Sequence, residues 1–364
     1  MPHKDIQEKL LHWFSIHHRD LPWRKTYEPY HIWISEIMLQ QTQMDRGVQY
    51  FNRWVERFPT IASIAAAHEN EILKLWEGLG YYSRARNIKK TANILMDQYC
   101  GRLPDDHSAL MKLPGIGPYT AGAIMSLAFN QDYPLVDANV ERLFSRLFDI
   151  AQPIKQHETQ KYIWLLASKH VPAGKARFFN QAIMELGALI CLSQNPMCDL
   201  CPLPDNCMSL QNDTVSQRPV MKRAQKIIPI YMATGILIHD NKCFIQKRPA
   251  DGVWANLWEF PGGRIEPGET PEQALVREYM EETEFSIVST KKITTIKHSY
   301  MQYRVTLHCF SCKLVNCRTT PTLHAAQEYR WITLGELKEF AFPAGHRKFI
   351  EKLRNSHNTL HYID

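Results

Sequence analysis

The stretch "LMKLPGIGPYTAGAIMSLAF" covers residues 110–129 and contains the turn that decides the fold of the first half of the chain. Pro114, Gly115 and Gly117 predict a tight hairpin that opens into a helix. Glycine lets the backbone approach a phosphate closely, and the first turn of a helix offers unpaired N–H groups. We therefore expect Gly115 and Gly117 to contact a phosphate backbone.

Helical patterns surround this hairpin. Apolar residues recur at three- and four-residue spacing throughout residues 1–211, as in "HIWISEIML" and "NQAIMELGALI". Residues 212–229 are polar and basic, which predicts a linker. Strand-like stretches follow in "YMATGILI", "KCFIQKR" and "YRVTLHCFSCKLV", with helices expected in "TPEQALVREYMEET" and "LGELKEF". The sequence predicts an all-α domain over residues 1–211 and an α/β domain over residues 230–364.

Composition limits the partners. The chain has 364 residues, a formal charge of +6 and a pI near 8.7, which suits two domains and is compatible with a polyanionic partner. The sequence contains no run of 18 apolar residues, so no membrane span is predicted. Nine cysteines without a secretory signal predict a reducing, cytoplasmic location and metal or thiol chemistry.

Four of these cysteines lie within residues 191–207 with the spacing C-x6-C-x2-C-x5-C: Cys191, Cys198, Cys201 and Cys207. Four thiolates so close together can hold an iron–sulfur cluster or zinc. Zinc sites more often pair two C-x-x-C knuckles, so one knuckle favours a cluster, and a zinc loop stays the alternative. Cys309 and Cys312 should point to opposite faces of a strand, which predicts packing rather than chelation.

Two carboxylates stand out in the helical region. Asp137, in "VDANV", precedes a helix, where it acts as an N-cap or, ionised, as a stabiliser of a sugar cation. Glu36 lies among large apolar residues in "HIWISEIMLQQTQ". It is either a solvent-facing helix charge or a buried carboxyl whose raised pKa makes it an acid near neutral pH. A protonated Glu36 and an ionised Asp137 would divide the work of cleaving a glycosidic bond.

The motifs "SEIMLQQTQ", "GLGYYSRARN", "LPGIGPYTAGAI", "VDANV" and "FNQAIMELGALIC", together with the cysteine loop, resemble the adenine DNA glycosylase (MutY) family over essentially the whole chain. That family belongs to the endonuclease III superfamily of helix–hairpin–helix glycosylases. The resemblance implies a [4Fe–4S] cluster on the four cysteines and a Nudix-like C-terminal domain. It also implies removal of adenine opposite 8-oxoguanine or guanine in double-stranded DNA, by a protein we expect to be monomeric.

The resemblance also implies roles for individual residues. Glu36 would protonate adenine at N7, and Asp137 would stabilise the sugar cation with support from Tyr119 and Asn139. The extruded adenine would lie in a pocket of Trp23, Arg24 and Gln181. Gln41 and Tyr81 would wedge into the base stack. The structural alternatives are a packing aromatic for Tyr119 and Tyr81 and a polar helix end for Gln41.

One residue position in the hairpin determines whether an enzyme of this superfamily also cuts the DNA strand. Superfamily members that cut the strand carry a lysine that forms a Schiff base, and the matching position here is Tyr119. This predicts a monofunctional enzyme that leaves an abasic site. The alternatives are an endonuclease III-like glycosylase/lyase, a silent mismatch binder, and residual nucleotide pyrophosphohydrolase activity in the C-terminal domain.

That last alternative rests on "GGRIEPGETPEQALVREYMEETE", residues 262–284, which resembles the Nudix box. Glu278, Glu281 and Glu282 share one helical face and would hold Mg²⁺ only if the box is active. Glu284 stands where the box has glycine, which ends a helix better. The expected lesion-reading residues are Tyr300 and Gln302, in "HSYMQYR", with Met301 between them and His298 or Ser299 as substitutes.

Overall fold

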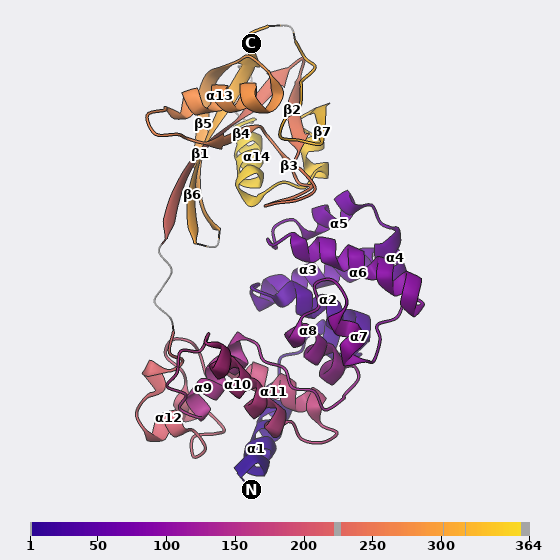
Figure 1. Cartoon of the computed structure of the whole chain (residues 1–364), viewed down its shortest axis with the longest axis vertical. Coiled ribbons are helices and arrows are strands. Elements are labelled where there is room, and N and C mark those ends of the chain that lie inside the picture. Colours follow the sequence, from indigo (N-terminus) through magenta and orange to yellow (C-terminus); the bar gives the residue numbers. More distant parts are fainter. Residues whose placement is uncertain (1, 222–226, 301, 317, 358–364) are drawn as a thin grey trace. The chain divides into compact units, whose positions relative to one another are not determined.

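The computed structural model describes residues 2–221, 227–300, 302–316 and 318–357. The chain divides into two compact units (Figure 1). The first comprises Met1–Ala66 and Asn87–Ala224, and the second comprises Ala67–Arg86 and Gln225–Asp364. The polypeptide therefore passes from one unit to the other three times.

The first unit is helical. A π-helical turn, η2 (Ile124–Ala128), continues α8, and short 3-10 turns occur at Pro22–Arg24, Cys198–Leu200 and Val215–Gln217. Among its described residues, none of the helices is both long and apolar enough for a bilayer span. The helices are α1 (Pro2–His17), α2 (Pro29–Leu39), α3 (Met44–Arg57), α4 (Ile61–Ala66), α6 (Ser83–Tyr99, whose first turn belongs to the second unit), α7 (His107–Met111), α8 (Pro118–Ala123), α9 (Ala138–Leu147), α10 (His157–His170), α11 (Ala176–Leu189) and α12 (Met208–Gln211).

Helix α2 forms the centre of this unit. It begins at Pro29, whose fixed φ suits the first helical position, and the Glu28 side chain caps it by accepting from the Tyr30 N–H. Every residue from Ile32 to Met38 is buried. A helix that is apolar on all sides is an interior helix, because no face of it favours water. The two polar residues of this buried stretch, Ser35 and Glu36, are consequently enclosed by protein.

The predicted hairpin joins α7 to α8. Gly115 has φ +80°, and a Cβ on it would lie 2.8 Å from the Asn87 Cβ on α6, so glycine serves both the turn and the close packing. Gly117 is the N-cap of α8, and Pro118 occupies the first helical position. Gly115 is exposed and Gly117 is partly buried, so the turn borders solvent.

The second unit contains a seven-stranded sheet of order β3-β2-β1-β6-β5, in which β4 also pairs with β1 and β7 with β2. Only the β1–β6 pair is parallel among the described strands. The elements are α5 (Glu69–Trp76), β1 (Ile228–His239), β2 (Lys242–Lys247), β3 (Trp258–Glu259), β4 (Gly262–Arg264), α13 (Pro271–Thr283), β5 (Ile287–Tyr300), β6 (Tyr303–Leu314), β7 (Glu328–Ile332), the 3-10 turn η5 (Glu336–Glu339) and α14 (Ala344–His357).

Helices α13 and α14 cover opposite faces of the sheet (Figure 1). Phe349 of α14 packs in the cluster that contains Cys309, whereas Leu275 of α13 packs in the cluster that contains Cys312. Both thiols are fully buried. The prediction that these two cysteines point to opposite faces of one strand is confirmed.

The segment Ala67–Arg86 packs against the C-terminal residues of the second unit. The Glu77 carboxylate accepts from the Phe342 N–H at 2.9 Å and pairs with Arg347 at 2.7 Å. Tyr82 donates its hydroxyl proton to the Phe342 carbonyl at 3.1 Å. Twenty residues that interrupt the first unit in sequence are in this way bound to α14 and the turn before it.

The expected elements and the observed ones differ at three elements, η5, β5 and α14. The pattern "LGELKEF" predicts a helix over residues 334–340, but only the four-residue turn η5 forms there. Strand β5 and helix α14 follow no pattern singled out in the sequence, and β5 is irregular, with register shifts between Ser289 and Lys291 and between Lys292 and Thr294. Such bulges break the two-residue alternation by which a strand is recognised.

Candidate active site

A pocket of about 830 Å³ opens in the first unit and falls in the size range of ligand-binding clefts, about 300–1,000 Å³. Helices α2, α8 and α11 and the turns before α8 and α9 supply its walls. It brings together all but one of the residues singled out in this half of the chain, the cysteines apart: Trp23, Arg24, Glu36, Gln41, Gly115, Gly117, Tyr119, Asp137, Asn139 and Gln181.

Glu36 lies in the pocket wall with only 4% of its surface exposed. Burial raises the pKa of its carboxyl to about 7, and the negative charge of Asp137 adds to the rise. The Tyr119 hydroxyl donates a hydrogen bond to Glu36 Oε2 and opposes it. Of the two states left open by the sequence, the structure has the buried one, and its carboxyl is half protonated near neutral pH.

Asp137 is the N-cap of α9. Its Oδ1 accepts from the Val140 N–H at 2.8 Å, and its Oδ2 accepts from the Asn139 side-chain amide at 2.8 Å. Burial raises the pKa of this carboxyl as well, but the bonds from Val140 and Asn139 counter the rise. Among the residues that the structure describes, Asp137 therefore has more hydrogen-bond donors than Glu36, which accepts from Tyr119, and these donors favour the ionised form of Asp137.

Arg142 fixes the orientation of the Asn139 amide. Its guanidinium donates to Asn139 Oδ1 at 2.9 Å and to the Gly187 carbonyl at 2.6 Å, and its Nε donates to the Cys191 carbonyl at 2.8 Å. A Cβ on Gly187 would lie 2.7 Å from the Asn139 Cβ, so glycine permits α11 to come this close. Arg142 thus connects the cysteine loop to Asn139, whose amide donates a hydrogen bond to Asp137.

A buried carboxylate that the sequence motifs did not reveal holds Arg24. Glu185 is 1% exposed and accepts from Arg24 at 2.8 Å and from Arg19 at 2.8 Å. Burial alone would raise the pKa of Glu185, but the hydrogen bonds from both guanidinium groups lower it to about 2. The available signal was that Glu185 stands four residues after Gln181 and so shares its helical face.

The remaining pocket residues differ in burial: Trp23 and Gln181 are buried, whereas Gln41 is exposed. Trp23 is buried and meets Phe51 edge to face at 5.1 Å, and the buried Gln181 donates to the Tyr27 hydroxyl at 3.2 Å. Gln41 is exposed and has φ 57°, a left-handed conformation that is uncommon outside glycine. Strain of this kind is typical of functional positions, so Gln41 keeps its predicted role in contacting DNA as a hypothesis.

Tyr81 belongs to the second unit. It has φ 45° and follows Gly78 and Gly80, which also have positive φ. The buried Arg84 donates to the carbonyls of Leu79 and Gly80 at 3.0 and 3.2 Å and holds this turn. The turn is therefore shaped within its own segment, and the role of Tyr81 as a wedge remains a prediction.

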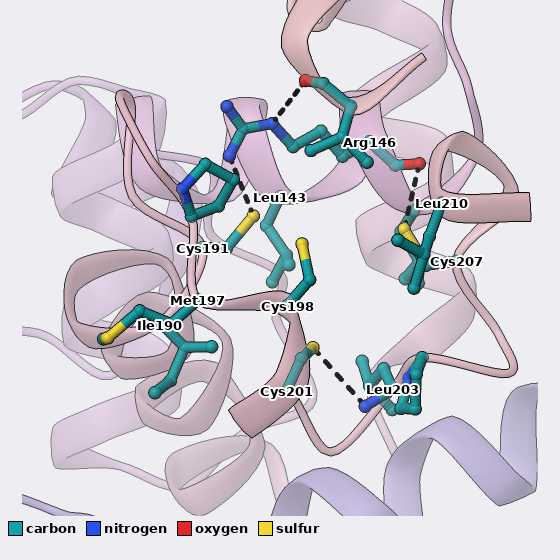
Figure 2. A pocket seen from close by; sticks show the side chains of 14 residues that line it. Leu143, Arg146, Ile190, Cys191, Met197, Cys198, Cys201, Leu203, Cys207 and Leu210 are labelled. Atoms are coloured by element: carbon teal, nitrogen blue, oxygen red, sulfur yellow. Dashed lines mark hydrogen bonds between the residues drawn. The ribbon is translucent and has the colours of Figure 1, made fainter. Parts of the chain in front are cut away.

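The four cysteines surround one small cavity between α9 and the loop after α11, as Figure 2 shows. None forms a disulfide. Arg146 donates to Cys191 Sγ at 3.3 Å, and the Leu203 N–H donates to Cys201 Sγ at 3.5 Å. Such donors suit thiolates, so the set fits a thiolate-bound metal centre. Among the described residues, no three acidic, cysteine or histidine side chains already have the geometry of a metal site.

The carboxylates of the Nudix-like box are occupied by protein partners. Arg277 pairs with Glu269 at 2.7 Å and with Glu278 and Glu281 at 3.0 Å. Glu282 accepts from Gln246 at 2.9 Å, and burial raises the pKa of its carboxyl to about 8. Two of the three carboxylates on the helical face, Glu278 and Glu281, therefore share Arg277, and the third, Glu282, is bound by Gln246.

Glu284, which replaces the glycine of the box, nevertheless ends α13 in a left-handed conformation with φ 56° and ψ 20°. Its carboxylate pairs with Arg318 at 3.1 Å and with His324 at 3.0 Å, so the side chain is held where glycine would have none. In the expected reading loop, Gln302 is partly buried, while the Tyr300 side chain and Met301 fall outside the described residues.

Comparisons with known proteins agree with this arrangement. Residues 34–169 match the HhH-GPD superfamily of base excision DNA repair proteins, and residues 233–352 match the NUDIX domain. The adenine DNA glycosylase of Buchnera aphidicola subsp. Acyrthosiphon pisum is 35% identical over 300 residues, 82% of this chain and 83% of the relative. The adenine DNA glycosylase of Buchnera aphidicola subsp. Baizongia pistaciae is 40% identical over 258 residues, which cover 70% of this chain and 72% of the relative. A thermostable thymine-DNA glycosylase structure has a TM-score of 0.54 and 31% identity, covering 58% of this chain and 97% of its own.

Proposed function

Because this chain belongs to the adenine DNA glycosylase family of base-excision repair enzymes, we propose that it hydrolyses the glycosidic bond of adenine opposite 8-oxoguanine or guanine in duplex DNA. The observation that carries this proposal is the pair of buried carboxyls, Glu36 and Asp137, that line one pocket with different hydrogen-bond donors. Divergent carboxyls mark the acid and the stabiliser in glycoside cleavage.

The division of work follows from the contacts. Glu36, whose pKa burial raises to about 7, would in its protonated form give its proton to N7 of the extruded adenine and weaken the C1′–N9 bond. Asp137, with its N-cap and amide donors, would stay ionised and stabilise the oxocarbenium-like sugar. Tyr119 would orient the acid, and the Arg24–Glu185 pair would form a fixed wall for the base.

An assay of adenine release tests the proposal. Duplex that contains adenine opposite 8-oxoguanine is incubated with the protein and then treated with alkali. We expect an alkali-dependent cut at the adenine, lost in Glu36→Gln and retained in the matched control Glu158→Gln, whose carboxylate is exposed on α10. No cut by the unaltered protein, or full activity in Glu36→Gln, would refute the assignment. The latter result would favour a silent mismatch binder.

We propose further that the enzyme is monofunctional and acts as a monomer in the cytoplasm. Tyr119 occupies the hairpin position, and no lysine is among the described residues that line the pocket, so no amine is available for a Schiff base. Borohydride should therefore trap no covalent adduct. A trapped adduct would favour the glycosylase/lyase alternative. An opposite-base series on one duplex would measure the preference for 8-oxoguanine over guanine.

The four cysteines are proposed to hold a [4Fe–4S] cluster, which when bound would fix the loop of residues 191–207 and, through Arg142, the position of Asn139. The donor set and the two N–H contacts to sulfur support this. Purified protein should contain iron and acid-labile sulfide, and Cys198→Ser should lower both. Stoichiometric zinc without sulfide would establish the zinc loop instead.

A further inference from the structure

Tyr27 stands just outside the wall of the active-site pocket and has an unusual backbone. It is partly buried in the turn before α2, and its φ of 53° is a left-handed conformation that bulky residues rarely adopt. Tyr27 does not line the pocket, yet its hydroxyl accepts a hydrogen bond at 3.2 Å from the amide of Gln181, which does. A strained aromatic residue bound to a pocket residue indicates a functional constraint, because the surrounding structure must hold the strain.

Contacts with α11 hold the ring of Tyr27. The Arg177 guanidinium lies 4.4 Å from the ring centroid, and Phe178 meets the ring edge to face at 6.3 Å. Arg177 is itself held, since it donates to the carbonyls of Leu127 and Ala128, both at 2.7 Å. The Tyr27 hydroxyl is therefore carried by a ring with little freedom to move.

The amide of Gln181 has both of its N–H groups bound by protein. Nε2 donates to the Arg177 carbonyl, one turn earlier on α11, at 3.0 Å and to the Tyr27 hydroxyl at 3.2 Å. A carbonyl oxygen can only accept, so the nitrogen of the amide must face Arg177. Among the described residues, Gln181 Oε1 accepts no hydrogen bond. Gln181 consequently has an acceptor, and no donor, left for a ligand.

Gln181 stands beside the residues that hold the proposed acid. Met184 follows it by three positions on α11, and the Tyr119 hydroxyl lies 3.7 Å from the Met184 sulfur. The same hydroxyl donates to Glu36, and all four residues line one pocket. In adenine, N7 and the 6-amino group lie on the same edge of the base. A base whose N7 meets Glu36 would therefore turn its 6-amino group to the wall in which Gln181 carries an unused acceptor.

An acceptor without a donor distinguishes purines by the group at position 6. Adenine has an amino group there, which donates, whereas guanine has a carbonyl oxygen, which accepts. An unconstrained glutamine would suit both, because rotating its amide exchanges the oxygen for the N–H groups. In this pocket the rotation would turn the amide oxygen of Gln181 toward the Arg177 carbonyl and break the bond to Tyr27.

We propose that Tyr27 is a positioning residue that holds Gln181 with only its amide oxygen available, so that the pocket favours a purine with a 6-amino group over a 6-oxo purine. The inference rests on the proposed function, because it takes adenine as the extruded base. Tyr27 acts through Gln181 and does not touch the base or the bond that breaks.

The test couples the Tyr27 hydroxyl to the 6-amino group of the base. Single-turnover release is measured with the full chain on a duplex with adenine opposite 8-oxoguanine and on one with unsubstituted purine, which has hydrogen at position 6, in its place. The unaltered protein should release purine about 5- to 150-fold more slowly, since a buried acceptor loses its partner. Tyr27→Phe keeps the ring, and it should slow adenine release about fivefold, the worth of one neutral hydrogen bond, while purine release stays unchanged.

A third duplex, with hypoxanthine in place of adenine, tests the preference directly. Tyr27→Phe frees the Gln181 amide to turn an N–H toward the 6-oxo group, so hypoxanthine release should be at least as fast as in the unaltered protein. A loss of stability alone could not slow one base and spare another. Slower hypoxanthine release in Tyr27→Phe would overturn the inference.

The matched control is Tyr162→Phe, which removes the hydroxyl of an exposed tyrosine on α10 and should change none of these rates. Equal slowing of adenine and purine release by Tyr27→Phe would show a merely structural role and overturn the inference, as would no slowing of either. Equal release of both bases by the unaltered protein, or purine release too slow to measure, would overturn the assignment of one acceptor to the amino group. Lack of adenine release by the unaltered protein would refute the proposed function instead, so the two failures are distinguishable.

Discussion

Glu36→Gln should make the protein more stable at alkaline pH while abolishing adenine release. Folding raises the pKa of this carboxyl from 4.5 to about 7 because the side chain is buried in α2. The folded protein therefore binds one more proton than the unfolded chain between these two values, and its stability falls as pH rises through that window. Each pKa unit corresponds to 1.36 kcal/mol, so the ionised carboxyl costs about 3 kcal/mol above pH 7.

Glutamine has nearly the shape of protonated glutamic acid and carries no charge at any pH. The free energy of unfolding of Glu36→Gln should exceed that of the unaltered protein by less than about 1 kcal/mol at pH 5, near the start of the window, and by about 3 kcal/mol at pH 8. Urea unfolding followed by tryptophan fluorescence at both pH values measures this, with Glu158→Gln as the control that shows no pH-dependent gain. An equal difference between Glu36→Gln and the unaltered protein at pH 5 and pH 8 would refute the reasoning.

Three further outcomes follow from neighbouring contacts. Tyr119→Phe removes the hydrogen bond that opposes the rise in the pKa of Glu36. The alkaline limb of the single-turnover pH–rate profile should therefore move to higher pH by about one unit. An unmoved limb would contradict this. Arg142→Ala frees the Asn139 amide and should slow single-turnover adenine release at least about tenfold, since misplaced supporting groups cost rate, while duplex affinity stays unchanged. Glu185→Gln leaves two guanidinium groups unpaired and should lower the free energy of unfolding at pH 7 by about 3 kcal/mol, measured by urea denaturation.

Local sequence predicted the hairpin, the position of Asp137 before a helix and the opposite directions of Cys309 and Cys312, because each depends on residues within one or two turns. It left the state of Glu36 open, since what covers α2 comes from elements far away in the chain. Glu185 went unnoticed for the same reason. Its partner Arg19 is 166 residues away, and only the folded chain brings the two together.

Strand β5 was missed for a local reason, because bulges interrupt the alternation of apolar and polar residues along it. Its register with β6 shifts twice between Ser289 and Thr294, so apolar residues do not alternate regularly there. The sequence therefore indicates β6, in "YRVTLHCFSCKLV", but not its partner β5, whose position follows only from the register between the two strands.

The three passages of the polypeptide between the two units set an order of events during synthesis. Glu77 and Tyr82 emerge from the ribosome long before Phe342 and Arg347, the residues to which they bind. At about 5–20 residues per second, the interval is on the order of 10–50 s. During that time the segment Ala67–Arg86 has none of its α14 contacts, so the turn that carries Tyr81 gains them only after residue 347 has emerged. A nascent chain halted near residue 224 should accordingly leave this segment open to proteolysis, and the released full-length protein should protect it.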